Sequence, residues 1–445
     1  MGRYFGTDGF RGEAGVSLTA EQSYKIGRFL GGYRRKNDGR IRVVIGKDTR
    51  RSSYMLEYAL ASGIAASGAD AYMLHVTTTP SVSFVAAGDG FDYGIMISAS
   101  HNHYADNGIK ILNSRGEKID DDTIAEVEAY IDGKEADIPL ATGASVGEIV
   151  DYYAGRNRYI GYLISLSRYS FKGFRVGLDT ANGGAWMIAK SVFDALGAET
   201  YVINAVPNGI NINENCGSTS VASLVSLVKA EGLDVGFAFD GDADRCIAVD
   251  ECGEIVNGDK ILYLLSNFLR AAGELSGNTV VTTVMSNLGL YKALDKSGVS
   301  YEKTAVGDRY VYDAMQKSGY SLGGEQSGHV ILSKYATTGD GILTAVKVME
   351  AMISSKLPLS KLVEPVKMLP QMTVNIRVRD KSAVMKSAAV NEAVQRISNL
   401  LQKDGRILLR ESGTEPVVRV MVEAESESLC RSLCESVAEI IRAEA

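Results

Sequence analysis

The sequence predicts an α/β fold built from three similar successive units, with a smaller α+β unit at the end of the chain. Short apolar runs typical of strands alternate with amphipathic stretches typical of helices, which indicates layered α/β domains. The chain has 445 residues, of which 45% are hydrophobic, so it is too long for one core but can fill several. A stretch with Pro358, Pro365 and Pro370 precedes a region with a different pattern. We therefore expect four domains, at residues 1–150, 151–256, 257–366 and 367–445.

The first unit is expected to place a serine at the end of a buried strand. Its predicted elements are a helix at 20–34, a strand at 41–46, a helix after residue 53, a strand at 71–76, a short helix after residue 80, a strand ending at residue 98, a strand at 109–112 and a helix capped by residues 120–122. The apolar run before Ser98 stops at the polar stretch that contains Ser100. Because Asn107-Gly108 is typical of a tight turn, Ser100 is expected in an exposed loop. It is a candidate nucleophile or phosphate carrier, although helix caps and simple turns use the same residue types.

The later units repeat this alternation. The second is predicted to contain a helix at 151–166, a strand at 175–179, a helix to 196, a strand at 201–204, a helix capped by Ser218 or Ser220, and a strand at 235–239. The third begins with a helix from 257, followed by a strand at 279–283 and, after further helices, a strand ending at 323–325. The last is predicted to have a strand at 372–378, one long helix at 382–402, strands around Arg410 and a helix at 426–442.

Three carboxylates follow the apolar strand of the second unit. Asp240, Asp242 and Asp244 occupy alternate positions, so an extended loop could bring several oxygens onto one hard divalent cation. An EF-hand is excluded, because Arg245 stands where that loop requires glycine. The pattern favours Mg²⁺ with phosphate ligands over a solvated acidic turn.

Two further loops carry hydrogen-bonding groups. Glu325 and Ser327 lie with His329 on a glycine-rich loop, and in an extended loop the first two would point the same way, toward the vicinal hydroxyls of a polyol. A hairpin with a polar tip is the alternative. The last unit offers charge, hydroxyls and an exposed backbone suited to a phosphate monoester, and its candidates are Arg410, Ser412, Gly413, Thr414 and Arg419. An ordinary turn with an exposed arginine is the alternative.

Composition limits the partners and the compartment. The formal charge is −7 without a dense Lys/Arg run, which argues against nucleic acid or an anionic membrane as the main partner. Neither a signal-like start nor a membrane-spanning apolar stretch is found, so we expect a cytoplasmic protein. The five cysteines lack a Cys-x-x-Cys pair and indicate reduced thiols. Cys430 and Cys434 share a helix face and are expected to pack in a core.

These four loops, in this order across the whole chain, resemble those of the α-D-phosphohexomutase superfamily. The resemblance implies mixed sheets and loops that converge on a central cleft. It implies that Ser100 is a phosphoserine whose phosphate binds Mg²⁺ together with Asp240, Asp242 and Asp244. It also implies that Glu325 and Ser327 hold the sugar. The phosphate site would consist of Arg410, Ser412, Gly413, Thr414 and Arg419.

Other stretches are more similar to the phosphoglucosamine mutase subfamily than to its phosphomannomutase and phosphoglucomutase relatives. They are residues 5–12, 211–213 with 216–218, Gln326 and 337–341. This resemblance implies that glucosamine 6-phosphate and glucosamine 1-phosphate are interconverted through glucosamine 1,6-bisphosphate, which would feed UDP-N-acetylglucosamine and cell-wall synthesis. The alternatives are a phosphomannomutase/phosphoglucomutase, a sugar-phosphate sensor and a Mg²⁺-dependent phosphatase. The sequence leaves both a monomer and a homodimer open. His103 stands where the family usually has proline.

Such a reaction assigns roles to further residues. Lys110, Arg11 and Arg245 are candidates to neutralise the moving phosphoryl group, and Lys110 or His329 could relay protons to the sugar oxygen. His101 follows Ser100 directly, and on an extended backbone the two side chains diverge. We therefore expect His101 to orient neighbouring groups rather than to act as the base of a Ser-His pair.

Overall fold

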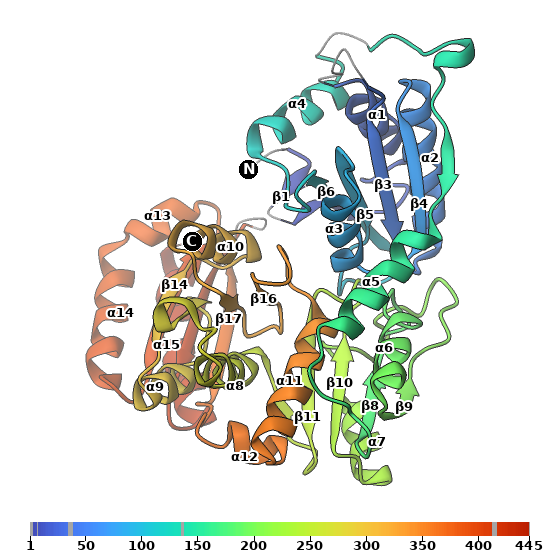
Figure 1. Ribbon diagram of the computed structural model, residues 1–445. Helices are drawn as coiled ribbons and strands as arrows, with labels where there is room; N and C mark the ends of the chain where they lie inside the picture. Colours follow the sequence, from blue (N-terminus) through green and yellow to red (C-terminus); the bar gives the residue numbers. More distant parts are fainter. Residues whose placement is uncertain (1–2, 7, 34–38, 135–137, 412–415, 445) are drawn as a thin grey trace. The chain divides into compact units, whose positions relative to one another are not determined.

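The computed structural model describes residues 3–6, 8–33, 39–134, 138–411 and 416–444 (Figure 1). Its contacts divide the chain into two compact units. Unit 1 comprises Met1–Val284 and Val299–Val363, and unit 2 comprises Met285–Gly298 and Glu364–Ala445. Each unit is described by itself below.

Unit 1 begins with a mixed seven-stranded sheet. Its strands are β1 (Phe5–Gly6), β2 (Gly9–Glu13), β3 (Arg42–Lys47), β4 (Asp70–Val76), β5 (Tyr93–Ile97), β6 (Asp106–Asn113) and β7 (Ile149–Asp151). They lie in the order β1-β2-β6-β5-β3-β4-β7. The strands β5, β3, β4 and β7 run parallel, whereas β1, β2 and β6 are joined to the sheet by antiparallel pairing.

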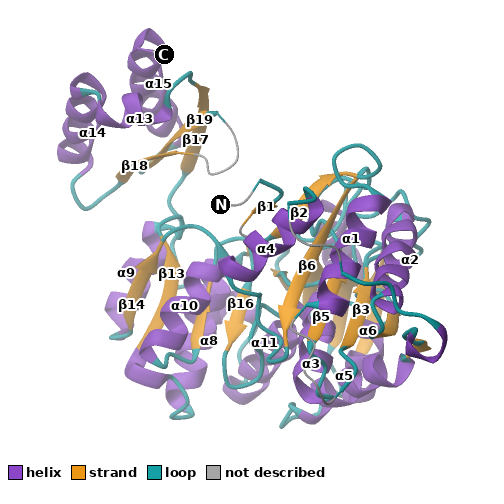
Figure 2. Ribbon diagram, turned by 90° about the horizontal axis from the view of Figure 1, so that it is seen from above, coloured by secondary structure: helices purple, strands orange, loops and turns teal. Residues whose placement is uncertain are grey.

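Helices cover both faces of this sheet (Figure 2). They are α1 (Ala20–Gly32), α2 (Arg51–Ala66), α3 (Thr79–Gly88), α4 (Asp121–Ile131) and α5 (Tyr153–Ser165). On β3, Val43 and Ile45 belong to the core formed with α1, α2 and α4, while Val44 belongs to the core formed with α3. Alternate residues of a strand point to opposite faces, so a continuous apolar strand is what this three-layer arrangement requires.

Two more mixed sheets complete unit 1, as predicted. The second contains β8 (Arg175–Asp179), β9 (Glu199–Ile203), β10 (Val235–Phe239), β11 (Cys246–Asp250) and β12 (Ile255–Val256), in the order β12-β11-β10-β8-β9, with helices α6 (Ile188–Leu196) and α7 (Ala222–Glu231). The third contains β13 (Thr279–Thr283), β14 (Ser300–Thr304), β15 (Leu322–Gly324) and β16 (Val330–Leu332), in the order β14-β13-β15-β16, with helices α8 (Gly258–Ala271), α10 (Asp308–Ser318), α11 (Gly341–Ser355) and α12 (Leu359–Val363). Each pairs parallel strands with an antiparallel edge. Two short 3₁₀ helices, η1 (Gly143–Ser145) and η2 (Ser276–Asn278), lie between these elements.

Unit 2 is the expected α+β unit. It also contains α9 (Leu288–Ser297), which comes from an earlier part of the chain. Its antiparallel sheet consists of β17 (Gln371–Arg377), β18 (Arg406–Glu411) and β19 (Val417–Glu423), in the order β17-β19-β18. The sheet packs with helices α13 (Lys381–Lys386), α14 (Ala388–Leu401) and α15 (Glu427–Glu444). Cys430 and Cys434 lie in this core, which confirms packing as their role.

Four local predictions were wrong or incomplete. Asn107-Gly108 lies inside β6, where a Cβ on Gly108 would stand 2.4 Å from the carbonyl oxygen of Ser98; this glycine permits close strand approach instead of a turn. The long helix of the last unit breaks at Ser387, whose side chain accepts from the Val390 amide and caps α14. Helix α7 starts without a side-chain cap, after Val221.

The pattern also missed α11, which Figure 1 shows beside β10 and β11. The first 12 residues of α11 are all buried, so the helix lacks an amphipathic period.

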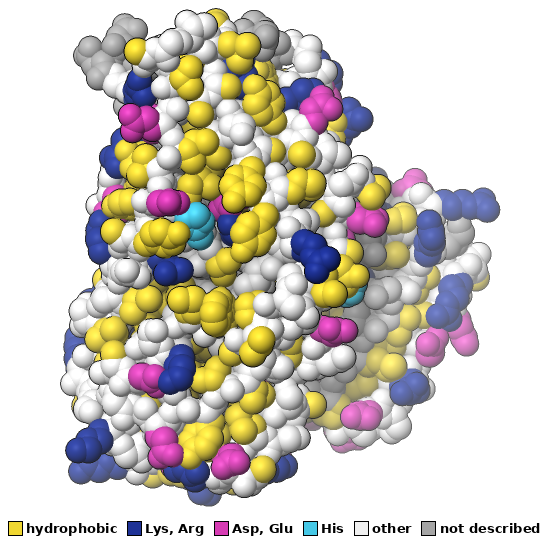
Figure 3. Space-filling view, turned by 90° about the vertical axis from the view of Figure 1, so that its right-hand side faces the viewer, with side chains coloured by type: hydrophobic (Ala, Val, Ile, Leu, Met, Phe, Trp, Pro, Cys, Tyr) yellow, Lys and Arg dark blue, Asp and Glu magenta, His cyan; other side chains and the backbone are white. Residues whose placement is uncertain are grey.

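The surface of unit 1 carries mixed chemistry. The face in Figure 3 shows apolar side chains in small groups between basic and acidic ones. Tyr54, Met55 and Tyr58 are exposed on α2. Among the described residues, no helix has both the length and the apolar character needed to cross a membrane.

Candidate active site

Ser100 lies directly after β5 and is fully buried, so the expectation of an exposed loop is corrected. The loop is covered because distant segments of unit 1 pack on it. Ser100 has a φ of 52°, a left-handed conformation that is uncommon for a residue with a side chain. Its hydroxyl donates a hydrogen bond of 2.5 Å to Oδ2 of Asp240. The serine of the first sheet and the acidic loop of the second sheet therefore meet.

The three aspartates converge as their alternate spacing predicted. One ligand oxygen of each of Asp240, Asp242 and Asp244 lies within 4.8 Å of the others, and all three side chains are buried. Oδ1 of Asp242 and Oδ1 of Asp244 have no hydrogen-bond partner among the described residues. Buried carboxylate oxygens without donors are costly unless a cation uses them. This donor set fits a hard divalent cation such as Mg²⁺.

The charges of the cluster shift its proton affinities in opposite directions. Burial, and then the charges of Asp244 and Asp242, raise the pKa of Asp240 well above its usual value. Burial alone would also raise the pKa of Asp244, but the ammonium group of Lys110 and the neighbouring His329 hold it well below the usual value. Carboxylates that share a buried site raise one another's pKa, whereas a nearby cation lowers the pKa of the carboxylate that it contacts.

Lys110 is buried in this cluster. Its Nζ is 2.8 Å from Oδ2 of Asp242, 3.1 Å from Oδ2 of Asp244 and 3.3 Å from Oδ2 of Asp8. Burial lowers the pKa of Lys110, but the three carboxylates raise it by more than burial lowers it. The pKa of Lys110 is therefore well above its usual value. Arg11 forms an ion pair with Asp8. Lys110 therefore reaches the aspartates directly, and Arg11 reaches them through Asp8. The third predicted cation, Arg245, has its Nε 3.8 Å from Oδ1 of Asp244.

His101 lies beside the serine hydroxyl, contrary to the expected divergence. Nδ1 of His101 is 3.3 Å from Oγ of Ser100, because the left-handed backbone at Ser100 turns the two side chains together. Burial and the positive charges of Arg245 and Arg11 lower the pKa of His101 to about 4. The imidazole is therefore neutral near pH 7.

The predicted sugar loop is a tight turn and is bonded to the aspartate loop. The Gly328 amide donates to the Glu325 carbonyl, so the loop is not extended. The Cys246 amide donates to the Gly328 carbonyl at 3.0 Å, and Arg245 pairs with His329 in an isolated bridge. These bonds hold the sugar loop at the end of the acidic loop.

The side chains of this turn have different surroundings. Oε1 of Glu325 accepts from the Gly307 amide at 3.1 Å, and Oγ of Ser327 is buried without a hydrogen-bond partner in the described part of the chain. Nε2 of His329 accepts from the Gly339 amide at 3.1 Å, while Nδ1 lies 3.8 Å from Oδ1 of Asp244. Burial lowers the pKa of His329, but Asp244 raises it more. Backbone amides therefore hold the Glu325 and His329 side chains in place.

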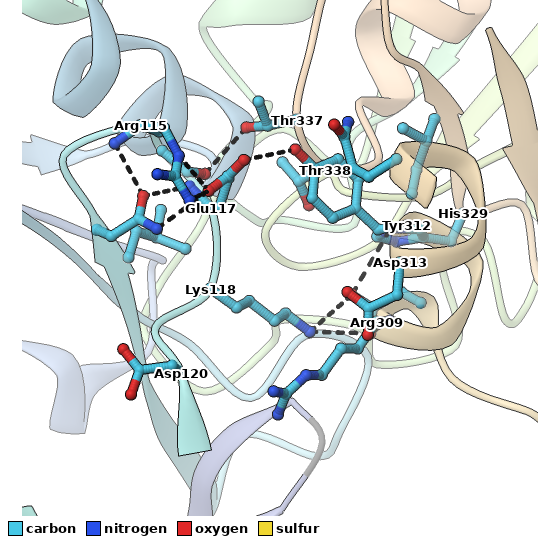
Figure 4. A pocket seen from close by; sticks show the side chains of 16 residues that line it. Arg115, Glu117, Lys118, Asp120, Arg309, Tyr312, Asp313, His329, Thr337 and Thr338 are labelled. Carbon is cyan, nitrogen blue, oxygen red and sulfur yellow. Dashed lines mark hydrogen bonds and ion pairs between the residues drawn. The ribbon is translucent and has the colours of Figure 1, made fainter. Parts of the chain in front are cut away.

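A pocket of about 420 Å³ adjoins the cluster within unit 1 (Figure 4). Lys118 extends into it toward α10 and forms an ion pair of 2.7 Å with Asp308, and it also reaches Asp8 at 2.9 Å. His329 and Thr337 line the same pocket. This volume is typical of a small-molecule site.

In unit 2, two of the predicted phosphate ligands stand opposite each other. Arg410 on β18 pairs directly with Arg419 on β19. Burial, and then the charge of Arg419, lower the pKa of Arg410. Like charges placed directly opposite are destabilising, and an anion would relieve the repulsion. The other three candidates, Ser412, Gly413 and Thr414, lie outside the described residues.

Comparison with known proteins identifies the family. The four domain models of the phosphoglucomutase/phosphomannomutase family match in succession: alpha/beta/alpha domain I at residues 2–137, domain II at 157–253, domain III at 257–369 and the C-terminal domain at 374–440. A phosphoglucosamine mutase of Lachnospira eligens is 62% identical over 444 residues, covering 99% of both chains. One of Bacillus cereus is 45% identical over 444 residues, covering 100% of this chain and 99% of the relative. The chain belongs to the phosphoglucosamine mutase family.

Membership of the phosphoglucosamine mutase family makes the protein an isomerase of amino sugar metabolism, an intramolecular phosphotransferase. Solved structures share its fold. A phosphoglucomutase/phosphomannomutase family protein of Burkholderia thailandensis superposes with a TM-score of 0.81 at 24% identity, covering 99% of this chain and 98% of that one. N-acetylphosphoglucosamine mutase of Aspergillus fumigatus, solved with GlcNAc-6P and magnesium, gives a TM-score of 0.71 at 18% identity, covering 99% and 95%.

The structure adds residues to the site that the loop motifs did not single out. Asp8 and Lys118 link the aspartate cluster to the pocket, and Arg50 and Asn213 contact the serine loop. Asp8 and Asn213 lie within stretches already typical of the phosphoglucosamine mutase family, and Arg50 follows a strand end. The family-typical stretches could have indicated Asp8 and Asn213, and the strand end could have indicated Arg50. His103 is exposed and its ring lies 4.2 Å from that of Tyr104.

Proposed function

We propose that the protein interconverts glucosamine 6-phosphate and glucosamine 1-phosphate through a phosphorylated Ser100 and glucosamine 1,6-bisphosphate. The observation that carries the proposal is the hydrogen bond of 2.5 Å from Ser100 to Asp240, at a buried carboxylate cluster that contains Lys110. The names of the full-length relatives support glucosamine phosphates as substrates. The product would feed UDP-N-acetylglucosamine and peptidoglycan precursors.

Ser100 is the proposed carrier of the phosphoryl group. In the first half-reaction the bond between phosphorus and Oγ of Ser100 breaks, a bond from phosphorus to the free sugar hydroxyl forms, and the hydroxyl proton leaves to a base. After the bisphosphate reorients, the second half-reaction returns the other phosphoryl group to Ser100. One carrier and one cation site thus serve both ends of the sugar, and positioning supplies most of the rate.

The cluster around Ser100 is proposed to stabilise the negative charge of the phosphoryl group during transfer. Asp240, Asp242 and Asp244 would hold Mg²⁺ together with an oxygen of the Ser100 phosphate, and the bound ion would supply positive charge to the phosphoryl group. Lys110 is a buried cation, so its proposed role is to neutralise charge, jointly with the residues Arg11 and Arg245.

Other residues are proposed to transfer protons and to orient the substrate. His329 is the proposed proton relay; because Nε2 accepts the Gly339 amide hydrogen, the neutral ring carries its proton on Nδ1. The neutral His101 would orient the unphosphorylated Ser100 hydroxyl. Glu325 and Ser327 are proposed to bind sugar hydroxyls. The residues proposed for the phosphate that is not reacting are Arg410, Ser412, Gly413, Thr414 and Arg419.

The proposal extends to organisation, assembly and compartment. The four domains would be 1–150, 151–256, 257–366 and 367–445, each supplying one loop, and the successive family matches support this division. A bisphosphate activator would maintain the phosphorylated enzyme. The exposed apolar residues of α2 support a homodimer, which light scattering can test. The free thiols support a cytoplasmic location.

The deciding experiment compares turnover of glucosamine 6-phosphate, glucose 6-phosphate and mannose 6-phosphate, with inorganic phosphate measured in parallel. We expect preference for glucosamine 6-phosphate, no stoichiometric phosphate release, and phosphate on Ser100 by intact mass and peptide mapping. A preference for glucose or mannose phosphate would favour phosphoglucomutase/phosphomannomutase activity instead. Stoichiometric phosphate release would indicate a phosphatase. Full turnover by Ser100→Ala would remove Ser100 as the carrier.

A further inference from the structure

The guanidinium group of Arg50 binds the backbone of the serine loop, which comprises residues 98–105 between β5 and β6. Nη2 of Arg50 lies 2.9 Å from the carbonyl oxygen of Ser100 and 2.9 Å from that of Asn102. Nη1 lies 3.0 Å from the carbonyl oxygen of Asp106 and also bonds that of His103. Arg50 is fully buried, so these bonds are shielded from water. One side chain therefore fixes three carbonyls of the loop and the carbonyl of Asp106 at the start of β6.

Arg50 is itself held by a residue that also supports the serine. Nε of Arg50 donates to Oδ2 of Asp48 at 2.8 Å. The Ser98 hydroxyl donates to the same carboxylate oxygen at 2.7 Å and accepts from the Ser100 amide at 2.9 Å. This network belongs wholly to the first sheet. It shapes the loop but does not tie it to the aspartates of the second sheet.

A second side chain supplies that tie. Nδ2 of Asn213, in the segment between β9 and α7, lies 2.8 Å from the carbonyl oxygen of Ser100 and 3.1 Å from that of Asn102. The Asn213 amide donates to the carbonyl of Ala181, just after β8, at 3.0 Å. The strand β8 pairs with β10, which delivers Asp240. Asn213 thus connects the carrier serine to the sheet that carries its carboxylate partner.

The contact matters because the serine backbone is strained and close to the acidic loop. A left-handed conformation at a residue with a side chain is unfavourable and persists only where the surroundings fix it. The acidic loop also approaches Ser100 directly, since a Cβ on Gly241 would lie 2.5 Å from the Ser100 carbonyl oxygen. A small rotation of the Ser100 peptide would move the hydroxyl away from Asp240.

We infer that Asn213 is a positioning residue for phosphoryl transfer: its amide holds the Ser100 carbonyl against the second sheet and so sets the distance from the serine hydroxyl to the aspartate cluster. The inference rests on the proposed role of Ser100 as the phosphoryl carrier. It does not depend on which hexose phosphate is the substrate. Asn213 touches no reacting atom, so its loss should slow transfer without weakening substrate binding.

The test uses the full-length protein with two variants and one matched control. Asn213→Ala removes the donor, and Asn213→Asp keeps the shape but places a carboxylate against two carbonyls. Asn211→Ala is the control, because Asn211 lies in the same segment and its side chain bonds only Val206 and Asn208 among the contacts of the described residues. The readouts are kcat and KM for glucosamine 6-phosphate, and the rate at which Ser100 is phosphorylated by glucose 1,6-bisphosphate, followed by intact mass.

We expect Asn213→Ala to lower kcat and the rate of Ser100 phosphorylation by about 10-fold to 100-fold with KM within about threefold, and Asn213→Asp to lower both rates further. Asn211→Ala should stay within about twofold of the wild type. Unchanged rates in Asn213→Ala, or an equal loss in Asn211→Ala, would overturn the inference. Absence of wild-type turnover with every hexose phosphate would count against the proposed function. In that case the rate of Ser100 phosphorylation still tests the role of Asn213, because this rate can be compared between Asn213→Ala and wild type without turnover. If Ser100 of the wild type does not accept phosphate, the inference is overturned as well.

Discussion

The ammonium nitrogen of Lys110 lies 2.8 Å from a carboxylate oxygen of Asp242, and the exposed fractions of the two side chains are 2% and 0%. A buried ion pair is stabilising only while both partners are present, because either charge alone is left without water. Lys110 also reaches Asp244, so one ammonium compensates two carboxylates. The pair connects the first sheet to the cation site.

We therefore expect Lys110→Met to lower kcat by about 100-fold or more, because a fixed positive charge near the phosphoryl group is lost. The variant should also gain more thermal stability from added Mg²⁺ than the wild type does, since the ion would then compensate carboxylates that have lost their partner. Thermal midpoints with and without Mg²⁺ measure the second effect. Lys190→Met, which removes an exposed pair with Asp194, is the control and should change neither quantity appreciably. Equal Mg²⁺ responses in Lys110→Met and wild type would contradict this account.

Asp242→Asn tests the cation site directly. Its Oδ1 is buried without a hydrogen-bond partner in the described chain, so the amide replaces a free carboxylate oxygen with a weaker ligand. We expect the stabilisation by Mg²⁺ to disappear and turnover to fall by about 100-fold or more. Glu254→Gln changes an exposed carboxylate of the same unit and serves as the control. Calorimetric titration with Mg²⁺ that gave the same affinity for Asp242→Asn and wild type would place the ion elsewhere.

The strand-to-loop pattern was sufficient to predict the sheets and to select Ser100, Asp240 and Glu325, because polar residues that end an apolar strand must emerge at a sheet edge. The burial of Ser100 and Lys110 could not be predicted in this way. It depends on side chains brought from distant segments of unit 1, such as Asn213, and a local pattern contains no information on such contacts.

Backbone conformation was the second limit. The prediction for His101 assumed an extended chain, and a single left-handed residue at Ser100 reversed the relative direction of the two side chains. In the same way, Gly108 was interpreted as a turn residue, although the reason for glycine is the carbonyl of Ser98 close to its Cα. A glycine has several structural uses, and only the packed structure distinguishes them.

Gly339→Ala should disturb His329 without touching the aspartates chemically. A Cβ at residue 339 would lie 2.6 Å from Nε2 of His329 and 2.7 Å from the carbonyl oxygen of Asp244, so the ring must move. We expect kcat to fall by about tenfold or more through the misplaced imidazole. Gly161→Ala is the matched control: this helical glycine has open space around its Cα, and alanine there should stabilise α5 by up to about 1 kcal/mol with normal turnover. Full activity in Gly339→Ala would show that the position of His329 is not critical.

Asp340 is expected to make stability depend on pH. Burial raises the pKa of Asp340 to about 6, although the Leu343 amide and the Tyr159 hydroxyl both bond its carboxylate. Because the pKa is higher in the folded state than the usual 3.8, the folded state binds the proton more tightly. The resulting stabilisation is complete below pH 3.8 and is lost as the pH rises through 6, a difference of about 3 kcal/mol. Asp340→Asn keeps a cap for α11 and a partner for Tyr159 without the ionisation. Relative to wild type, its free energy of unfolding should therefore increase by about 2 kcal/mol between pH 4 and pH 7 in denaturant titrations. Asp122→Asn, at an exposed carboxylate, should give a much smaller change, and a pH-independent difference between Asp340→Asn and wild type would mean that Asp340 ionises normally.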